Sequence, residues 1–361
     1  MTTARELVER TLAADQRRVS AAIAATVPRE EPQRHLYELI DDLLQRPGKG
    51  FRASLCLASC RAFGGSDEQA LDAAVALELL HSAFLVHDDI EDGATQRRGA
   101  AALHRSHGVA LALNAGDGLC ALALSSLARS AARQPPEVAA ALVGEIAHLF
   151  RRTVEGQAWE LGWIADGNFD ISEADYFRMV LGKTCWYSTI HPCRLGALIG
   201  SGGSVKLDSI VPFGFYLGVA FQIRDDIDNL APGAAGYGKD VGGDIVEGKR
   251  TIPMLHLLRN GSAAERDEVL RLSDPNAAEP AAERILRVRA LMLKHRSLEY
   301  ARDVADRFTS KAIAEARHAF AGAVGHVDVQ YICAMALFVC GALRSEHSHD
   351  RVAMRASEAS G

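Results

Sequence analysis

The chain has 361 residues, of which 48% are hydrophobic and 24% are charged, and its formal net charge at pH 7 is −6. This composition is that of an ordinary globular protein with a sizeable core. Because no excess of lysine and arginine gives a basic footprint, we expect no nucleic-acid partner. No window of about 18 apolar residues is free of charge, so we also expect no membrane span.

The cysteines and the N-terminus indicate a reducing compartment. Seven cysteines are scattered along the chain, without the spacing of a zinc site or a redox pair. Free thiols are therefore expected. Residues 1–18 are polar and amphipathic and lack the apolar segment of a signal peptide. These features predict a cytoplasmic protein.

In chain order, the sequence predicts a succession of helices. Apolar residues recur three and four positions apart in residues 67–89 and 135–164, as on one face of a helix. Ser66 and Ser172 each precede a predicted helix as N-cap residues. Short segments rich in Gly, Pro, Ser or Asn interrupt the pattern at 45–50, 63–69, 132–137, 201–208 and 231–244.

These interruptions are too short to separate two hydrophobic cores. Alternating β-branched stretches are nearly absent, so the expected class is all-α, a single large helical bundle. The bundle is expected to span residues 1–344. Residues 345–361 lose the apolar pattern and predict a disordered polar tail.

The predicted helix over residues 70–92 ends in a cluster of carboxylates. Asp88 and Asp92 are four residues apart on one helical face, whereas Asp89 is rotated about 100° away from it. Mg²⁺ usually takes one or two carboxylates and leaves its other positions to water and phosphates. An acidic helix end is also common on a solvated surface, so this cluster alone does not decide the function.

A second cluster has the same construction. In residues 218–230, GVAFQIRDDIDNL, an apolar helix ends in Asp225, Asp226 and Asp228. Burial at the end of an apolar segment penalises unpaired charge, so both clusters call for a cation. Two such helix ends facing each other across a cavity predict a site for several Mg²⁺ ions around a diphosphate.

Basic residues beside glycines or turns complete the pattern. Each alone is ordinary on a solvated surface. Together they match two anionic diphosphates, because arginine binds phosphate oxygens bidentately and lysine acts as a point charge. These residues are Lys49, Arg52, Arg97, Arg98, Lys183, Lys239 and Lys249.

The ordered motifs resemble those of the trans-polyprenyl (isoprenyl) diphosphate synthases, from about residue 35 to about residue 345. DDIED with the following RRG is similar to the family's first aspartate-rich motif, and GKGFRA resembles its GKRxRP signature. GQAWEL, GKT, FQIRDD and GKDVGGDIVEGKRTIP follow in the family's order. The resemblance implies an all-α bundle around a deep central cavity, usually a homodimer, and a short-chain enzyme similar to geranylgeranyl diphosphate synthases.

The resemblance also implies roles for individual residues. Asp88, Asp92 and Asp225 would bind Mg²⁺, and these three with Arg97 and Lys183 would be the catalytic residues. The allylic diphosphate would be held by Arg97, Lys183, Thr184, Gln222, Lys239 and Lys249. Isopentenyl diphosphate would be held by Lys49, Arg52, His81 and Arg98. A lone histidine on an apolar helix is usually a core residue, but His81 lies seven residues before Asp88, about two turns along the same face.

Three positions depart from the family pattern. Gly50 and Ala53 replace the arginine and proline of the signature, which reduces the positive charge near isopentenyl diphosphate. Asn229 replaces the last aspartate of the second motif, so we expect any third ion to be held more weakly.

The prenyl tail is expected to pass the residues about one turn before Asp88. These are Phe84, which is aromatic, and Ala83, which is small. In the family, bulk here limits chain length, so one aromatic residue predicts the twenty-carbon product, geranylgeranyl diphosphate, ahead of the fifteen-carbon one. The alternative is that Phe84 only packs the bundle.

The implied reaction is a Mg²⁺-dependent head-to-tail condensation of isopentenyl diphosphate with an allylic prenyl diphosphate. Two alternatives share the fold: a class I terpene cyclase, which adds no isopentenyl diphosphate, and a non-catalytic partner subunit of a heteromeric synthase. The complete set of basic residues argues against the cyclase. The presence of both acidic motifs argues against the non-catalytic subunit.

Overall fold

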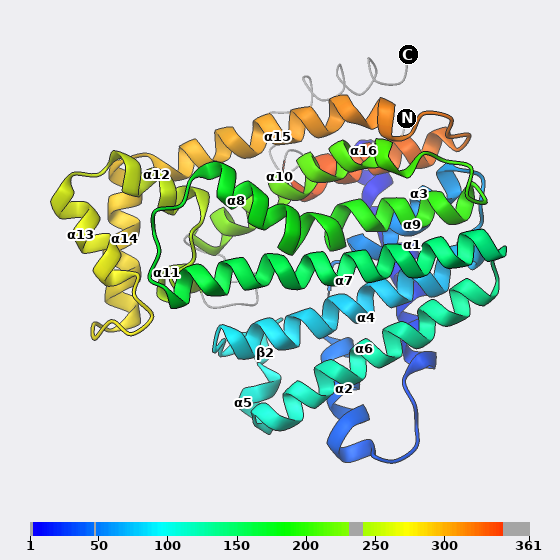
Figure 1. The fold of residues 1–361 in the computed structure, drawn as a ribbon, viewed down its shortest axis with the longest axis horizontal. Coiled ribbons are helices and arrows are strands. Elements are labelled where there is room, and N and C mark those ends of the chain that lie inside the picture. The colour runs from blue at the N-terminus through cyan, green and yellow to red at the C-terminus, as the bar shows by residue number, and fades with distance from the viewer. Residues whose placement is uncertain (1–2, 47, 231–240, 342–361) are drawn as a thin grey trace.

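A computed structural model of the chain describes residues 3–46, 48–230 and 241–341, which are almost entirely helical (Figure 1). The helices are α1 (Ala4–Thr26), the π-helical turn η1 (Gln33–Tyr37), α2 (Glu38–Gln45), α3 (Phe51–Ala62), α4 (Asp67–Glu91), α5 (Leu103–His107), α6 (Val109–Ala132), α7 (Pro136–Ala165), α8 (Glu173–Val180), the π-helix η2 (Leu181–Ile190), α9 (His191–Gly200), the 3₁₀ turn η3 (Leu207–Ser209), α10 (Ile210–Leu230), α11 (Gly243–Val246), α12 (Ile252–Asn260), α13 (Ala263–Leu272), α14 (Ala281–Lys294), α15 (Ser297–Ala319) and α16 (His326–Val339). The predicted all-α class is confirmed. The predicted tail at 345–361 lies outside the described residues.

Local signals in the sequence set the helix boundaries. The side chain of Ser66 forms a capping box with Gln69 at the beginning of α4, and Ser172 forms one with Asp175 at the beginning of α8. These caps satisfy backbone N–H groups that the first turn leaves without partners. Helices α2, α3, α6, α9 and α10 end at the predicted interruptions, whereas the ends of α4, α7, α12, α13 and α14 were not among them.

A short hairpin was not predicted. Its strands β1 (Gln96–Arg97) and β2 (Ala100–Ala101) pair antiparallel. The two residues between them, Arg98 and Gly99, have φ angles of 53° and 78°, as a tight hairpin turn requires. The turn fixes two neighbouring arginines in different orientations beside the end of α4.

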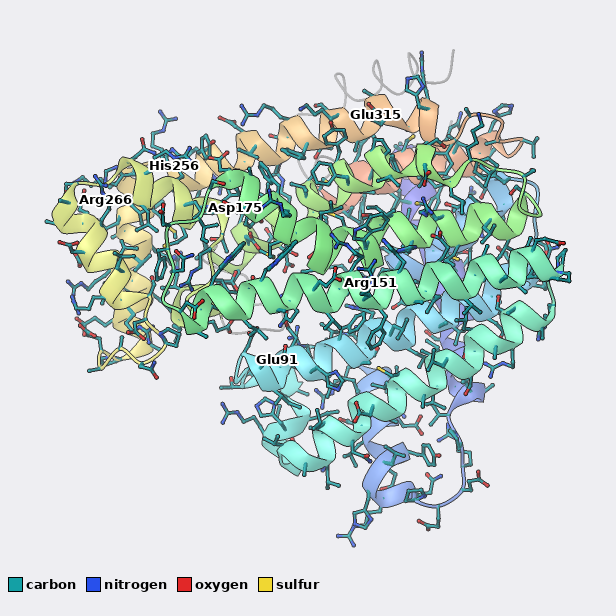
Figure 2. The ribbon with its side chains drawn as sticks, viewed as in Figure 1. Glu91, Arg151, Asp175, His256, Arg266 and Glu315 are labelled. Atoms are coloured by element: carbon teal, nitrogen blue, oxygen red, sulfur yellow. The ribbon has the colours of Figure 1, made fainter. Side chains whose placement is uncertain are left out.

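The bundle has two principal layers. In one, α4 packs against α3 and α6, and in the other α10 packs against α15. Fully buried residues such as Leu79, Leu119 and Leu142 join α4, α6 and α7, and Phe213 and Tyr331 join α10 and α16. In Figure 1, α13 and α14 lie at one end of the bundle. In Figure 2, the residues Glu91 of α4 and Asp175 of α8 lie toward that same end.

Within the part of the chain that the structure describes, two helices, α4 and α6, are long and apolar enough to cross a membrane by length and composition. The sequence predicted no membrane span because no long apolar window is free of charge. Length and composition alone therefore do not test that prediction. Most of the apolar window of α4 is buried inside the bundle, as in the core helix of a globular protein, whereas one third of that of α6 is buried. All seven cysteines are free, as predicted.

Candidate active site

The acidic ends of α4 and α10 face one large cavity of about 1300 Å³. Asp88, Asp225 and Asp228 line it. Ten other residues predicted for the site also line it: Lys49, Arg52, His81, Phe84, Arg97, Arg98, Lys183, Thr184, Gln222 and Lys249. The fold thus brings together residues from six separate sequence motifs, as the facing of two acidic helix ends predicted.

Three predicted residues do not line this cavity. Asp92 borders a small pocket beside it, together with Asn229. Ala83 is fully buried in the core between the helices. Lys239 lies outside the described residues.

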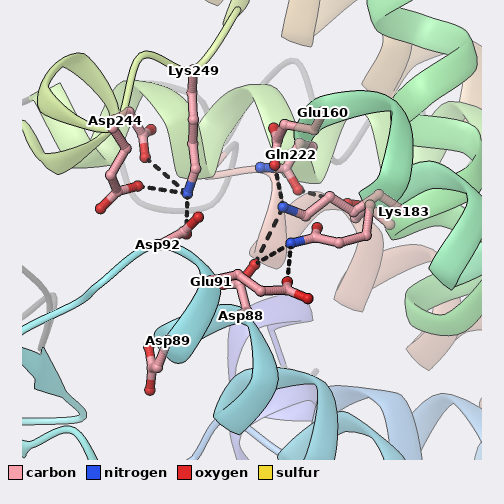
Figure 3. A network of polar contacts seen from close by, with 12 residues as sticks. Asp88, Asp89, Glu91, Asp92, Glu160, Lys183, Gln222, Asp244 and Lys249 are labelled. Carbon is pink, nitrogen blue, oxygen red and sulfur yellow. Dashed lines mark hydrogen bonds and ion pairs between the residues drawn. The ribbon is translucent and has the colours of Figure 1, made fainter. Parts of the chain in front are cut away.

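The carboxylates at the end of α4 point in two directions. Asp88 Oδ1 lies 3.3 Å from Lys183 Nζ, and Asp92 Oδ2 lies 2.7 Å from Lys249 Nζ. Asp89 points away from this network in Figure 3 and accepts hydrogen bonds from the guanidinium of Arg97. Because successive helical residues are rotated by about 100°, Asp88 faces the cavity whereas Asp89 faces Arg97.

Lys183 is held by a buried carboxylate that sequence reasoning missed. Its ammonium donates a hydrogen bond to Glu160 as well as to Asp88. Burial alone lowers the pKa of Lys183, but Glu160 and Asp88 outweigh it and raise that pKa above its usual value. The signal was present in GQAWEL, where Glu160 follows Gln157 by three residues on the same helical face.

Close contact between two backbones fixes the position of Lys183. A Cβ on Gly156 of α7 would lie 2.0 Å from the backbone nitrogen of Lys183, so only glycine fits there. Lys183 lies in η2, which continues α8 into α9 with π-helical geometry. Such π-helical segments occur frequently at functional sites. The glycines of the GQ and GK motifs thus serve helix packing.

Lys249 joins the α10–α12 connection to the end of α4. Its Nζ lies 2.7 Å from both Asp92 Oδ2 and Glu247 Oε2, and 3.8 Å from Asp244 Oδ1. Burial lowers the pKa of Lys249, but the carboxylates, Asp92 first, raise it well above its usual value. Burial raises the pKa of Asp92 to about 6 against the opposing effect of Lys249. Glu247 and Asp244 belong to the GKDVGGDIVEGKRTIP motif, and neither was predicted to be a site residue.

All three aspartates of the second acidic cluster line the cavity, and one of them, Asp226, is buried and hydrogen-bonded. Asp226 accepts hydrogen bonds from Tyr176 Oη at 2.7 Å and from Gln222 Nε2 at 2.8 Å. Burial raises the pKa of Asp226 to about 7. Gln222 Oε1 accepts from the hydroxyl of Thr184 at 2.8 Å. Tyr176 and Asp226 therefore hold Gln222 and Thr184, two predicted ligands, in place.

Asn229 has a different environment from the one expected for a weak metal ligand. It is buried, and its side-chain oxygen accepts a hydrogen bond from the backbone N–H of Asp244 at 3.4 Å. Its backbone carbonyl accepts from the N–H of Gly242 at 2.8 Å. Asn229 thus anchors the segment that carries Asp244.

The residues predicted for isopentenyl diphosphate gather at the beginning of α3. The buried guanidinium of Arg52 donates hydrogen bonds to Ser188 Oγ at 2.8 Å and Tyr187 Oη at 3.2 Å, and Nη1 lies 3.3 Å from His81 Nε2. His81 also stacks on the ring of Tyr187. His81 is therefore next to a cation at the cavity wall.

Backbone conformation accounts for the glycine at position 50, where the family signature has an arginine. Gly50 has a φ of +61°, and a Cβ there would lie 2.8 Å from Cγ of Gln16. Gln16 donates hydrogen bonds to the carbonyls of Gly48 and Lys49. A side chain at position 50 is therefore strained by backbone conformation and by contact with α1.

The aromatic wall of the cavity involves Phe84 without Ala83. The ring of Phe84 lies 5.4 Å from that of Phe150 and 5.5 Å from that of Tyr187. Ala83, one residue earlier, faces the packed core. Phe84 thus lines the cavity and Ala83 does not, because adjacent helical residues point about 100° apart.

The donor set fits Mg²⁺, a hard cation that prefers oxygen ligands. Among the described residues, no group of three or more His, Cys, Asp or Glu side chains is arranged to hold a metal ion by itself. Mg²⁺ ordinarily takes one or two carboxylates and completes its shell with water and phosphate oxygens. Asp88, Asp92 and Asp225, on two helix ends, provide such incomplete sets.

An all-α bundle in which two acidic helix ends and several buried cations meet at a partly apolar cavity defines a diphosphate-processing enzyme. The profile of the polyprenyl synthetase family matches residues 33–288, and the chain belongs to this family. It is a trans-prenyltransferase, that is, a polyprenyl diphosphate synthase.

Individual relatives support this assignment and differ in product. The geranylgeranyl diphosphate synthase of Sulfolobus acidocaldarius is 33% identical over 299 residues, which cover 82% of this chain and 86% of that protein. The octaprenyl diphosphate synthase of Haemophilus influenzae is 28% identical over 271 residues, covering 75% and 78%. A polyprenyl synthase of Caulobacter crescentus CB15, solved with calcium and isoprenyl diphosphate, aligns with a TM-score of 0.81 and 25% identity, and the alignment covers 94% of this chain and 98% of that one.

Proposed function

We propose that this enzyme condenses isopentenyl diphosphate head-to-tail with an allylic prenyl diphosphate and that Mg²⁺ is required. The observation that carries the proposal is the arrangement of Asp88 and Asp225 around one cavity whose other wall holds Arg52 and His81. One set of groups suits an ionising diphosphate and the other suits a second diphosphate. A terpene cyclase has no use for the second set.

Each step follows from charge. Lys183 and Lys249 offset the negative charge that develops on the leaving diphosphate as the allylic carbon–oxygen bond breaks. Arg52 and His81 orient isopentenyl diphosphate so that its double bond attacks the allylic carbocation and forms the new carbon–carbon bond. A proton then leaves, and the released diphosphate is the proposed acceptor. The apolar part of the cavity keeps water from the cation.

Asp88, Asp92 and Asp225 are the residues that would hold the metal ions. Bound Mg²⁺ supplies Lewis-acid stabilisation of the leaving group. The buried pair of Glu160 and Lys183 keeps a positive charge beside Asp88. Lys183 beside Asp88 and Lys249 beside Asp92 thus reduce the repulsion between the carboxylates of the site.

We propose a short-chain product, with geranylgeranyl diphosphate first. The support is the aromatic contact of Phe84 with Phe150 and Tyr187 at the cavity wall. These rings narrow the path that a growing tail would follow beyond Asp88. The differing products named for the relatives mean that family membership alone does not assign the length.

We also propose a homodimer that forms through α6 and α7. Of the twelve large hydrophobic residues exposed in the described chain, seven lie on these two helices: Val109, Leu113, Leu124, Val143, Phe150, Val154 and Trp159. Exposed apolar residues on two helices that pack against each other are typical of an interaction site. A second copy would cover these residues, which also accounts for the exposed apolar side chains of α6. Residues 1–344 are proposed to form one synthase domain.

Product analysis tests the proposed reaction. The purified protein is incubated with Mg²⁺, isopentenyl diphosphate and, separately, the five-, ten- and fifteen-carbon allylic diphosphates, and the products are identified by mass. We expect longer prenyl diphosphates that need both substrates and disappear with EDTA. A hydrocarbon formed without isopentenyl diphosphate would indicate the cyclase, and no product with any substrate would indicate the non-catalytic subunit.

A further inference from the structure

Arg250 is a buried arginine directly after Lys249. It is 2% exposed, and its guanidinium donates hydrogen bonds to three backbone carbonyl oxygens. These belong to Trp163, Asn168 and Gly248, at 2.7 Å and 2.8 Å for the first two. Burial lowers the pKa of Arg250 to about 10, so the guanidinium remains charged at neutral pH.

These carbonyls belong to two separate parts of the chain. Trp163 is in the last turn of α7, and Asn168 follows that helix, whereas Gly248 directly precedes Lys249. The guanidinium also lies 3.9 Å from the centroid of the Phe169 ring. A cation bound to the carbonyls at a helix C-terminus is favoured by the helix dipole. Arg250 therefore ties the end of α7 to the segment that carries Lys249.

The tie matters because both parts contribute to the site. α7 carries Glu160, which holds Lys183, and the other part carries Lys249, which reaches Asp92. Gly248, with a φ of +72°, turns the backbone between Glu247 and Lys249. If the contact of Arg250 with the end of α7 were lost, the backbone that carries Lys249 would be less fixed. Binding a diphosphate would then cost more conformational entropy, because the Lys249 ammonium would have to be positioned at that moment.

We propose that Arg250 is a positioning residue that sets the place of the Lys249 ammonium relative to α7, and thereby the binding of the diphosphate that Lys249 holds. The inference rests on the proposed function for the identity of the substrate. Arg250 also lines the cavity, but its guanidinium donates to three backbone carbonyls, so we assign it a role through its neighbour rather than a contact with the diphosphate. Lysine cannot replace it, because one ammonium cannot reproduce three donors in a planar fork together with stacking on Phe169.

The test is a double-mutant cycle on equilibrium binding of inorganic pyrophosphate in the presence of Mg²⁺, measured by calorimetry. Arg250→Lys is expected to weaken binding about tenfold in the wild-type background, a coupling of the size seen for residues in contact. In the Lys249→Gln background the same change is expected to alter binding less than about twofold. Equal losses in the two backgrounds would overturn the proposal.

Two further variants separate positioning from a loss of stability. Phe169→Leu keeps the guanidinium and removes its stacking partner, so it is expected to give a smaller loss in the same direction. The matched control is Arg284→Lys, another buried arginine, which donates to the carbonyls of Leu272 and Asp274 and at 3.2 Å to that of Val246. Arg284 does not line the cavity, so its replacement should lower the melting temperature and leave pyrophosphate binding unchanged.

Steady-state kinetics give a second readout. With Arg250→Lys, the KM for the allylic diphosphate should rise about tenfold while that for isopentenyl diphosphate stays within about twofold. Equal increases in both constants, or a loss of pyrophosphate binding as large in Arg284→Lys as in Arg250→Lys, would overturn the proposal. If the wild-type protein binds pyrophosphate with this coupling but forms no prenyl product, the proposed function fails and the positioning role stands.

Discussion

Replacing Phe84 by alanine tests whether the aromatic wall limits product length. The phenyl ring of Phe84 packs against Phe150 and Tyr187 at centroid distances of 5.4 Å and 5.5 Å. Removing its six carbons frees a space comparable to one five-carbon isoprene unit. Burying such a unit is worth roughly 4 kcal/mol at ~0.8 kcal/mol per carbon, which is about a thousandfold in binding. We therefore expect the dominant product of Phe84→Ala to be one isoprene unit longer.

The assay compares product lengths by mass at equal substrate conversion. Phe84→Leu should give an intermediate distribution, because leucine fills part of the space. Phe308→Ala is the matched control, since this ring packs against Phe177 and Phe215 in the core and does not line the cavity. It should lower stability without changing product length. An active Phe84→Ala enzyme with the wild-type distribution would refute the assignment of Phe84 to the wall.

Three other predictions follow from the charges. Asp88→Ala and Asp225→Ala should each lower kcat at least ~100-fold, as when one electrostatic stabiliser of a developing charge is lost, and near-wild-type turnover in both would contradict the metal assignment. Lys49→Ala and Arg52→Ala should raise the KM for isopentenyl diphosphate far more than that for the allylic substrate, whereas equal effects would indicate one diffuse basic patch. Burial raises the pKa of Glu145, but hydrogen bonds from an arginine and a histidine of α9 outweigh it and lower that pKa from 4.5 to about 2. Because the folded-state pKa is lowered, this stabilisation is present above pH 4.5 and is lost as the pH falls toward 2. Urea unfolding of Glu145→Gln should therefore show a loss of up to about 3 kcal/mol at pH 7 that shrinks across this range, and a constant difference would contradict the mechanism.

Helical periodicity made much of the site predictable. Asp88 and Asp92 were placed by their spacing, and both have lysine partners from distant segments. Asp89 was expected beside their face, and it binds Arg97 there. Such predictions succeed because one angle per residue determines the face on which a side chain lies.

Contacts between distant segments could not be predicted in this way. Nothing in the spacing of Glu160 and Lys183 says that α7 and η2 approach until only glycine fits between them. The packing of Arg250 on the end of α7 depends on the path of the α10–α12 connection, which periodicity does not describe. Ala83 illustrates a related limit. Its distance from Asp88 along the helix axis is similar to that of Phe84, but a rotation of about 100° turns its side chain from the cavity into the core.

One face of α4 organises the reaction along the cavity. His81, Phe84 and Asp88 follow one another at intervals of three and four residues, and all three line the cavity. At 1.5 Å per residue they span about 10 Å of the helix axis. His81 lies beside Arg52, Asp88 lies beside Lys183, and Phe84 lies between them on the apolar wall. Because one rigid helix sets these intervals, a change in wall size at Phe84 can alter tail length while the two charged ends keep their separation. Selection on product length can therefore act at the wall and leave the ionisation chemistry unchanged.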